Sequence, residues 1–367
     1  MLTKNKNGAW AYWVQEPGRS KLVSMSLAKP AEHEVRIRTL YSAISLGTER
    51  LVFSGAVPES QYESMRAPFQ DGEFPGPVKY GYSNVGRVEA GPKELIGRVV
   101  FCLYPHQDNY VVPQDAVVPV PETVPATRAV LAANMETAIN GLWDAPPVVG
   151  SKVIVVGAGV LGCLMAYLVS KIPGVEVQLV DIDLAKASVA KAFGIQFAEP
   201  GLASGEADLV IHASGTSEGL ATAFQLAGFE ATILEMSWFG SHTVSLPLGE
   251  SFHVKRLRLQ SSQVGTLGTT QRARWDHRRR LSLALDLLAE DFILHGYDIQ
   301  RLISVIVASA PFQRSSQSES GVTDGHESTW AAFPLVRVRP EQIAGAVVQS
   351  CSLTTINAHS HILQQLV

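Results

Sequence analysis

Residues 152–171 read KVIVVGAGVLGCLMAYLVSK, a β-branched run that passes through three glycines into an apolar stretch. The β-branched run predicts a buried strand at 152–156, and the apolar stretch predicts a helix at 160–171. The turn between them is Gly157-Ala158-Gly159-Val160-Leu161-Gly162. Glycine at these three places allows a tight turn, close approach of a pyrophosphate to the backbone, and close packing of the helix on the strand. The stretch is therefore typical of a dinucleotide-binding turn.

An acidic residue stands where such a site needs one. Asp181 follows the next predicted strand, at 175–180, and lies about 20 residues beyond the last glycine, which suits a carboxylate on the ribose hydroxyls. Because a carboxylate disfavours a 2′-phosphate and the next basic residue is Lys186, we expect NAD(H) to be favoured over NADP(H). The alternative is a domain of this class with an empty crevice. We assign to the cofactor Gly157, Gly159, Val160, Leu161, Gly162, Asp181 and Ser214.

Strands and helices alternate on both sides of Asp181. Alternation at this spacing predicts right-handed βαβ units and a doubly wound parallel sheet, in a domain spanning residues 136–265. We predict strands at 152–156, 175–180, 207–212, 231–236 and 257–260, and helices at 160–171, 184–193 and 217–227.

The flanking regions differ from this central domain. Residues 1–135 contain short β-branched runs between glycines and prolines, which predict a mostly β domain. We predict helices at 131–143 and 281–289, and a strand at 302–307 that returns to the first domain within residues 266–339. Residues 315–328 are predicted to form a loop and 333–338 a strand, whereas 340–367 form an atypical tail without a clear period.

Composition excludes several classes of protein. The chain has 367 residues, of which 46% are hydrophobic and 17% charged, so it is not a disordered chain. A net charge of −4 gives no reason for nucleic-acid or acidic-membrane binding, and three cysteines exclude a disulfide scaffold and a four-cysteine zinc site. Residues 1–18 lack the apolar core of a secretory signal, and the apolar run at 153–169 is too short to span a membrane. We expect a cytoplasmic protein with no nucleic-acid or membrane partner.

A β domain before a mid-chain dinucleotide domain resembles the medium-chain dehydrogenase/reductase superfamily, over residues 8–312. Three further segments carry the resemblance: SLGTE at 45–49, GYS at 81–83 and ETA at 136–138. Residues 44–50, 80–87 and 105–108 are most similar to the branch that contains 2-desacetyl-2-hydroxyethyl bacteriochlorophyllide a dehydrogenase. The resemblance implies a GroES-like catalytic domain, a Rossmann domain, contact of Thr137 with the nicotinamide, and pairing of two subunits through the sheet edge.

The chain departs from the zinc-dependent members of that superfamily. They carry Cys-Gly-Thr-Asp at residues 46–49 and Gly-His-Glu at residues 81–83 of this chain, and their third ligand falls near Ala133. Leu46 and Ala133 cannot bind a metal, and tyrosine, here Tyr82, is a poor zinc ligand beside thiolate and imidazole. The loop with four cysteines is also missing. We therefore predict a zinc-independent enzyme.

Without zinc, side chains must stabilise the substrate oxygen and move its proton. Through the resemblance, Thr48 matches a proton-relaying hydroxyl, and Tyr82 stands where a zinc-binding histidine would be. His106, whose pKa is near neutrality in water, is the candidate acid/base. The alternatives are a surface position for His106, core packing for Tyr82, and a purely structural ion pair between Glu49 and an arginine.

Arginines 272, 274 and 278–280 form a basic cluster that is either a solvated helix face or a site for a carboxylate or phosphate. The leading hypothesis for the whole chain is an NAD(H)-dependent oxidoreductase that interconverts a secondary alcohol and a ketone. Its substrate is expected to be bulky or apolar, because the site residues are mostly uncharged. The alternatives are an enone or quinone reductase and a dinucleotide-binding protein without turnover.

Overall fold

The structure is a computed structural model that describes residues 8–294. The strands predicted at 302–307 and 333–338, the loop at 315–328 and the tail at 340–367 lie outside the described residues. The boundaries of the predicted domains stay predictions.

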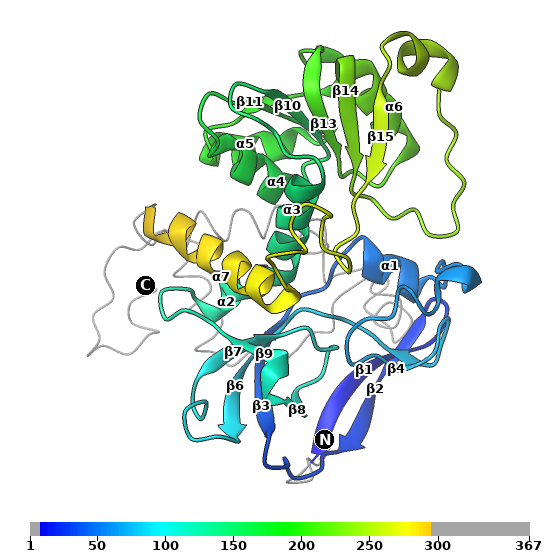
Figure 1. The fold of residues 1–367 in the computed structure, drawn as a ribbon. Coiled ribbons are helices and arrows are strands. Elements are labelled where there is room, and N and C mark those ends of the chain that lie inside the picture. The colour runs from blue at the N-terminus through cyan, green and yellow to red at the C-terminus, as the bar shows by residue number, and fades with distance from the viewer. Residues whose placement is uncertain (1–7, 295–367) are drawn as a thin grey trace, which may run out of the picture. The chain divides into compact units, whose positions relative to one another are not determined.

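A parallel sheet forms the core of the domain that contains the glycine turn (Figure 1). The order of its strands is β12-β11-β10-β13-β14-β15, and every neighbouring pair is parallel. This is the doubly wound order, in which the chain reverses its direction of travel across the sheet between β10 and β13. The strands are β10 (Lys152–Val156), β11 (Glu176–Val180), β12 (Gln196–Ala198), β13 (Ala207–His212), β14 (Ala227–Glu235) and β15 (Arg258–Ser261).

The five strands predicted in this region are confirmed, with ends that differ by up to four residues. Strand β12 was not predicted, because three residues are too few to show an alternation. The predicted helices are confirmed as α4 (Val160–Ser170), a short turn η3 (Leu184–Lys186) followed by α5 (Ala187–Ala192), and α6 (Ser217–Leu226).

The helices cover opposite faces of the parallel sheet. Val153 and Val155 of β10 belong to the hydrophobic cluster that contains the buried side of α4. Ile154 and Val156, which alternate with them, belong to a second cluster that contains the buried side of α6. Because neighbouring side chains of a strand point to opposite faces, β10 is buried on both sides. This explains its continuous β-branched sequence.

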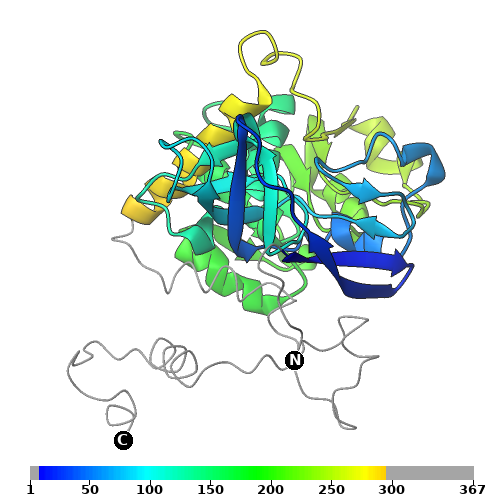
Figure 2. The same cartoon turned by 90° about the horizontal axis from the view of Figure 1, so that it is seen from below.

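Two antiparallel sheets make up the β-rich domain (Figure 2). The five-stranded sheet has the order β8-β3-β6-β7-β9, and the four-stranded sheet has the order β2-β1-β5-β4. The β1–β2 hairpin was not predicted. The strands are β1 (Gly8–Glu16), β2 (Arg19–Ser26), β3 (Glu34–Ser42), β4 (Asp71–Gly72), β5 (Val78–Lys79), β6 (Asn84–Ala90), β7 (Val99–Cys102), β8 (Asn109–Pro113) and β9 (Val117–Pro119).

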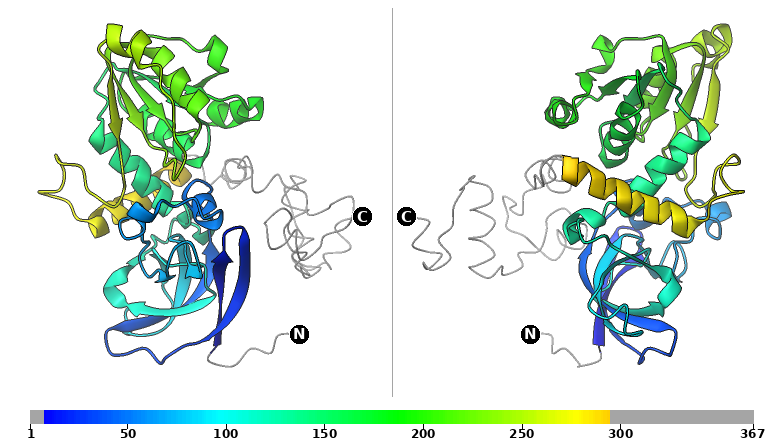
Figure 3. Two further views of the ribbon diagram at one scale, coloured as in Figure 1. Left: turned by 90° about the vertical axis from the view of Figure 1, so that its right-hand side faces the viewer. Right: turned by 60° about the vertical axis from the view of Figure 1, so that its left-hand side comes forward.

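Two longer helices, α3 (Ala132–Asp144) and α7 (His277–Leu294), pack against each other (Figure 3). Both confirm predicted helices, and α7 extends its prediction at each end. The remaining helical segments are α1 (Thr48–Phe53), α2 (Ala126–Ala129), the 3-10 turns η1 (Glu59–Gln61), η2 (Gln114–Ala116) and η4 (Pro200–Leu202), and the π-helical turn η5 (Leu248–Phe252). Within residues 8–294, no helix has the length and apolar character to cross a membrane.

Arg280 of α7 is buried and forms an ion pair with Glu136 of α3. Their side chains are 1% and 5% exposed, and Arg280 Nε lies 3.0 Å from Glu136 Oε1. The guanidinium also donates to Asn140 Oδ1 and, at 2.6 Å, to the carbonyl oxygen of Val264. All three guanidinium nitrogens therefore have partners. The sequence suggests either a solvated helix face or an anion site for the basic cluster, and neither describes Arg280. The periodicity of one helix does not reveal a buried acid on another helix.

Two neighbouring arginines of the cluster also have structural partners. Arg278 donates to the carbonyl oxygen of Asp115 at 2.6 Å, and the Arg279 guanidinium lies 3.9 Å from the ring centre of Trp275. These contacts hold the start of α7 in place. Because Arg278 and Arg279 already have partners within the protein, this part of the cluster does not resemble an anion-binding site.

Candidate active site and dinucleotide-binding turn

The glycine turn joins the end of β10 to the start of α4. Gly157 has a φ of +107°, a conformation that side chains rarely adopt. Its amide donates to the carbonyl oxygen of Val180 at 2.8 Å, and a Cβ on it would lie 2.6 Å from the amide nitrogen of Ser214. The turn is thus pressed between the ends of β11 and β13, at the switch point of the sheet.

Gly162 and Gly159 serve two different purposes. A Cβ on Gly162 would collide with the carbonyl oxygen of Gly157, so α4 can pack this closely only with glycine there. A Cβ on Gly159 would meet no heavy atom within 4 Å, so space is open in front of the helix. The first-turn amides of Val160 and Leu161 lack intrahelical partners. Open space before such amides fits a pyrophosphate.

Asp181 ties the glycine turn to the end of β11. Its Oδ2 accepts from the amide of Ala158 at 2.6 Å, and its Oδ1 accepts from the amide of Asp183 at 2.9 Å. Each oxygen keeps a second lone pair, so the carboxylate can still accept from a ribose hydroxyl. Lys186 lies 3.9 Å from the Asp183 carboxylate, which partners its charge. Contact of Asp181 with the ribose stays a prediction.

Thr137 lies in α3 and uses its hydroxyl within that helix. Its Oγ1 donates to the carbonyl oxygen of Ala133 at 2.9 Å. The hydroxyl oxygen retains lone pairs that can accept from a ligand. Contact with the nicotinamide therefore stays a prediction.

Tyr82 and Thr48 lie together, as the sequence interpretation requires. The side chain of Tyr82 is half-buried and lies near the side-chain hydroxyls of Ser45 and Thr48. Burial, together with the negative charge of Glu49, raises the pKa of Tyr82 to about 12, although the hydroxyls of Ser45 and Thr48 lower it. The phenol is therefore protonated at neutral pH and can donate a hydrogen bond.

His106 is largely buried and has a partner on each ring nitrogen. Nε2 lies 2.6 Å from Glu49 Oε2, and Nδ1 lies 2.6 Å from Ser42 Oγ. The side chains of His106 and Glu49 are only 12% and 10% exposed. Glu49 therefore pairs with His106, and not with an arginine as the structural alternative supposed. Sequence reasoning did not identify Ser42, which gives no signal in its local pattern.

The hydrogen-bond pattern around His106 fits an imidazolium. The Ser42 hydroxyl lies 3.0 Å from the carbonyl oxygen of Ser83 and can donate its one proton there, which leaves Nδ1–H to donate to Ser42 Oγ. Nε2–H then donates to the Glu49 carboxylate. Burial lowers the pKa of His106, but the charge and hydrogen bond of Glu49 outweigh burial and raise it above its ordinary value.

Gly81 brings the tyrosine segment against this histidine. It has a φ of +132°, and a Cβ on it would lie 2.9 Å from His106 Nε2. His106, Glu49, Thr48 and Tyr82 thus form one cluster, which we call the hydroxyl–imidazole cluster. Its members come from three separate segments of the chain.

Replacing His106 by glutamine is expected to cost less stability as the pH rises. Because the folded protein raises the pKa of His106, the ion pair stabilises the fold fully below about pH 6.5, the ordinary histidine value. This contribution is lost as the pH rises through the folded-state pKa. Denaturant unfolding of His106→Gln and wild type at about pH 6 and about pH 9 measures it. The exposed His253→Gln is the control, and an equal cost of His106→Gln at both pH values would contradict the assignment.

The residues that the sequence resemblance aligns with zinc ligands do not fit the metal. Leu46 and Ala133 present only hydrocarbon, and Tyr82 is a protonated phenol. Within residues 8–294, no group of three or more histidine, cysteine, aspartate or glutamate side chains could hold a metal ion.

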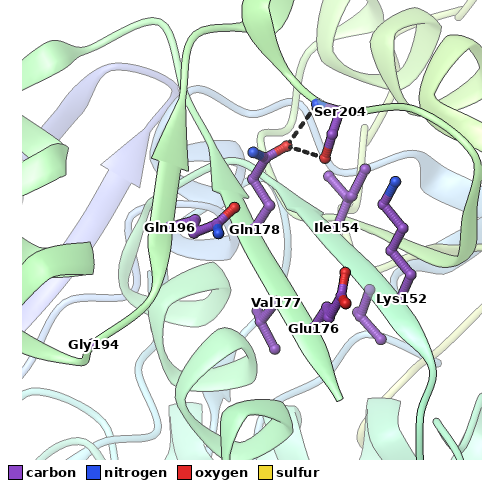
Figure 4. A pocket seen from close by; sticks show the side chains of 9 residues that line it. Lys152, Ile154, Glu176, Val177, Gln178, Gly194, Gln196 and Ser204 are labelled. Carbon is purple, nitrogen blue, oxygen red and sulfur yellow. Dashed lines mark hydrogen bonds between the residues drawn. The ribbon is translucent and has the colours of Figure 1, made fainter. Parts of the chain in front are cut away.

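A hollow of about 360 Å³ lies elsewhere, over the first residues of β10 and β11 (Figure 4). It is lined by polar side chains that include Lys152, Glu176 and Gln196. Ser204 closes one side of it, since its amide and hydroxyl donate to Gln178 Oε1 at 2.9 and 3.2 Å. In doubly wound sheets, ligands bind at the opposite, carboxyl ends of the strands. None of the assigned site residues lines this hollow.

Comparison with solved structures identifies the same architecture in oxidoreductases. Acetophenone reductase from Geotrichum candidum in complex with NAD matches with a TM-score of 0.61 and 17% identity, over 80% of this chain and 89% of that chain. 2R,3R-butanediol dehydrogenase from Bacillus subtilis matches with a TM-score of 0.60 and 13% identity, over 81% and 97%. A protein described as an NADPH:quinone reductase from Bacillus thuringiensis matches with a TM-score of 0.61 and 16% identity, over 77% and 88%.

Sequence comparison adds one partial match. The family model of PSD1, a protein of unknown function (DUF1553), matches residues 281–362, less than half of the chain. A search of the curated proteins finds no match. The structural matches confirm the predicted fold: the chain combines a GroES-like β domain with a Rossmann domain.

Proposed function

We propose that this protein is a zinc-independent, NAD(H)-dependent oxidoreductase that interconverts a secondary alcohol and a ketone. The observation that carries the proposal is the glycine turn at the switch point of a doubly wound sheet, with open space before α4 and Asp181 beside it. The hydroxyl–imidazole cluster supplies the groups that a carbonyl oxygen needs.

The glycine turn would hold the pyrophosphate, Asp181 the adenosine ribose, and Thr137 and Ser214 the nicotinamide half. The dinucleotide, when bound, supplies the hydride. Asp181 supports NAD(H) over NADP(H), because a 2′-phosphate would face a carboxylate that is already held by two backbone amides.

The hydroxyl–imidazole cluster would bind the substrate oxygen and supply its proton. Tyr82 is a protonated phenol, and with Thr48 it can donate to a carbonyl oxygen as negative charge develops there. His106, with both ring nitrogens donating, is the acid of the cluster and replaces the proton that the hydroxyls release. In the oxidative direction the same groups would carry the proton away.

Tyr82→Phe tests this assignment. Loss of one donor to the developing oxyanion is expected to lower kcat about 100-fold, with little change in the Kd for NADH, because the phenol does not hold the dinucleotide. Tyr80→Phe is the matched control: its ring packs edge-on against that of Tyr82, but its hydroxyl donates to the carbonyl oxygen of Met65 at 3.3 Å and not to a member of the cluster. Equal kcat values for Tyr82→Phe and wild type would remove Tyr82 from the mechanism.

Fluorescence titration with NADH and NADPH tests the cofactor proposal. We expect saturable binding of NADH and a higher Kd for NADPH. Absence of binding by either nucleotide would overturn the proposed function, and tighter binding of NADPH would overturn the preference. Metal analysis of protein purified without added zinc tests zinc independence, which stoichiometric zinc would refute.

A second candidate is reduction of an enone or quinone. It is favoured by the similarity to the protein described as an NADPH:quinone reductase, whose TM-score equals that of acetophenone reductase. NADH consumption with a bulky aryl ketone and with a quinone, measured side by side, separates the two. Binding of NADH without turnover on either would favour the third candidate, a dinucleotide-binding protein.

The remaining parts of the proposal rest on the sequence. A bulky or apolar substrate follows from the mostly uncharged site residues, and a homodimer follows from the family resemblance. The cytoplasmic location and the lack of nucleic-acid and membrane partners stay predictions. Size-exclusion chromatography with light scattering tests the dimer.

A further inference from the structure

A second histidine with two polar partners lies at the carboxyl ends of the parallel strands. His212 ends β13 and Glu235 ends β14, and the two residues are paired in register. The side chain of His212 is completely buried and that of Glu235 is 12% exposed. Ser214 follows two residues after His212. Neither His212 nor Glu235 takes part in the proposed hydride transfer.

The three side chains form a continuous hydrogen-bonded chain. His212 Nδ1 lies 2.8 and 2.7 Å from the two carboxylate oxygens of Glu235, and Nε2 lies 2.6 Å from Ser214 Oγ. Glu235 Oε1 is fixed by the amide of Ser237 at 2.7 Å. A hydroxyl bonded to an imidazole whose other nitrogen is held by a carboxylate is the arrangement of hydrolytic triads, which recur on unrelated folds.

The proton positions favour a nucleophilic serine. Ser214 Oγ lies 3.3 Å from the amide of Thr216 and 3.0 Å from its hydroxyl, and the Thr216 oxygen already accepts from Gly219. The Thr216 hydroxyl is therefore placed to donate to Ser214, which leaves the Ser214 proton for His212 Nε2. His212 in turn donates Nδ1–H to Glu235. In this arrangement every donor has an acceptor. The imidazole of His212 is neutral and can act as the base.

The surroundings of Ser214 suit attack on a carbonyl carbon. The serine lies in the turn between β13 and α6, where Gly215 and Thr216 are exposed. The amide of Gly215, the residue after the serine, donates to Ser237 Oγ at 3.0 Å. Because a hydroxyl partner can rotate away, this amide can become a donor to an oxyanion.

We propose that Ser214 is an activated nucleophile that hydrolyses small activated esters in the dinucleotide-free protein. Ser214 Oγ attacks the acyl carbon as its proton passes to His212 Nε2, and the leaving alkoxide takes that proton when the acyl–oxygen bond breaks. Water then attacks the acyl-serine, gives a proton to His212, and Ser214 recovers it as the carboxylic acid departs. Glu235 is the positioning residue, which holds the imidazole in the required tautomer. This proposal does not depend on hydride transfer.

The hydroxyl–imidazole cluster provides a contrast within the same molecule. Ser42 also bonds to a histidine, but its proton goes to the carbonyl oxygen of Ser83 and it accepts from the ring. A serine that accepts from an imidazolium is not activated, because no base receives its proton. Ser42 should therefore stay unmodified under conditions that modify Ser214.

The experiment treats the full-length protein, free of dinucleotide, with a fluorophosphonate, which phosphonylates a serine and releases fluoride. Peptide mass spectrometry then locates the modified residue. We expect one adduct, on the peptide that contains Ser214, and none on the peptide that contains Ser42. An unmodified Ser214 peptide under conditions that saturate a serine esterase would overturn the proposal.

Hydrolysis of p-nitrophenyl acetate tests the chain of three side chains. Ser214→Ala should abolish hydrolysis, and Glu235→Gln should lower kcat at least about tenfold with KM within about twofold, because an amide leaves the shape but removes the charge. Ser217→Ala, three residues further along, is the matched control with unchanged rates. Equal kcat for Glu235→Gln and wild type would overturn the role of the triad, and NADH titration of the wild-type protein and of Ser217→Ala reports separately on the proposed function.

Discussion

Gly162→Ala is expected to destabilise the protein by about 3 kcal/mol, the upper end of the usual cost of overpacking. The added methyl group would collide with the carbonyl oxygen of Gly157, and backbone atoms cannot move aside as a flexible side chain can. Relief requires α4 to move away from β10, which displaces the amides at the start of the helix. Dinucleotide affinity should therefore fall at least about tenfold, which is the effect expected when about one good contact is lost.

Gly159→Ala separates packing from binding. The residue has φ −71° and no heavy atom within 4 Å of an added Cβ, so the substitution should change the free energy of unfolding by less than about 0.5 kcal/mol. The methyl group would nevertheless occupy the space proposed for the pyrophosphate and weaken NADH binding. Denaturant unfolding and NADH titration of both variants check the pair. Wild-type stability of Gly162→Ala would contradict the packing argument.

Arg280→Ala is expected to destabilise the fold by about 3–5 kcal/mol, because it leaves the carboxylate of Glu136 buried without a counter-charge. The amide oxygen of Asn140 and the carbonyl of Val264 lose their donors as well. Arg279→Ala is the matched control: its guanidinium stacks on Trp275 at the surface, so its loss should cost less than about 1 kcal/mol. Denaturant unfolding measures both variants.

The cost of Arg280→Ala should grow with pH. Burial raises the pKa of Glu136, while the charge and hydrogen bond of Arg280 lower it, and the pKa remains above its ordinary value. Without Arg280 the folded-state pKa rises further, so the folded variant binds a proton more tightly than the unfolded chain. Protonated Glu136 needs no counter-charge, so the variant should lose less stability at about pH 4 than at about pH 7. An equal loss of stability at both pH values would show that the buried carboxylate of Glu136 does not cause the destabilisation.

Elements that depend on a regular hydrophobic period, or on a position where only glycine fits, could be predicted from the sequence. The strand at 152–156 is buried on both faces, which gives a continuous β-branched run, and Gly157 and Gly162 occupy places where a Cβ cannot fit. Strand β12 and the β1–β2 hairpin escaped prediction. Three residues are too short to display an alternation, and β2 of the hairpin has only exposed and half-buried positions, so no buried face marks it in the sequence.

The amino-acid sequence by itself therefore determined the doubly wound domain, its glycine turn and the residues that cannot bind zinc, since each depends on local periodicity or on the chemistry of single side chains. Only the tertiary structure decided which polar groups are partners. Glu49 with His106, Glu136 with Arg280, and His212 with Glu235 join segments far apart in the chain. Such pairs follow from how strands and helices pack, and no local pattern reports which side chain lies opposite, nor which partner holds the proton.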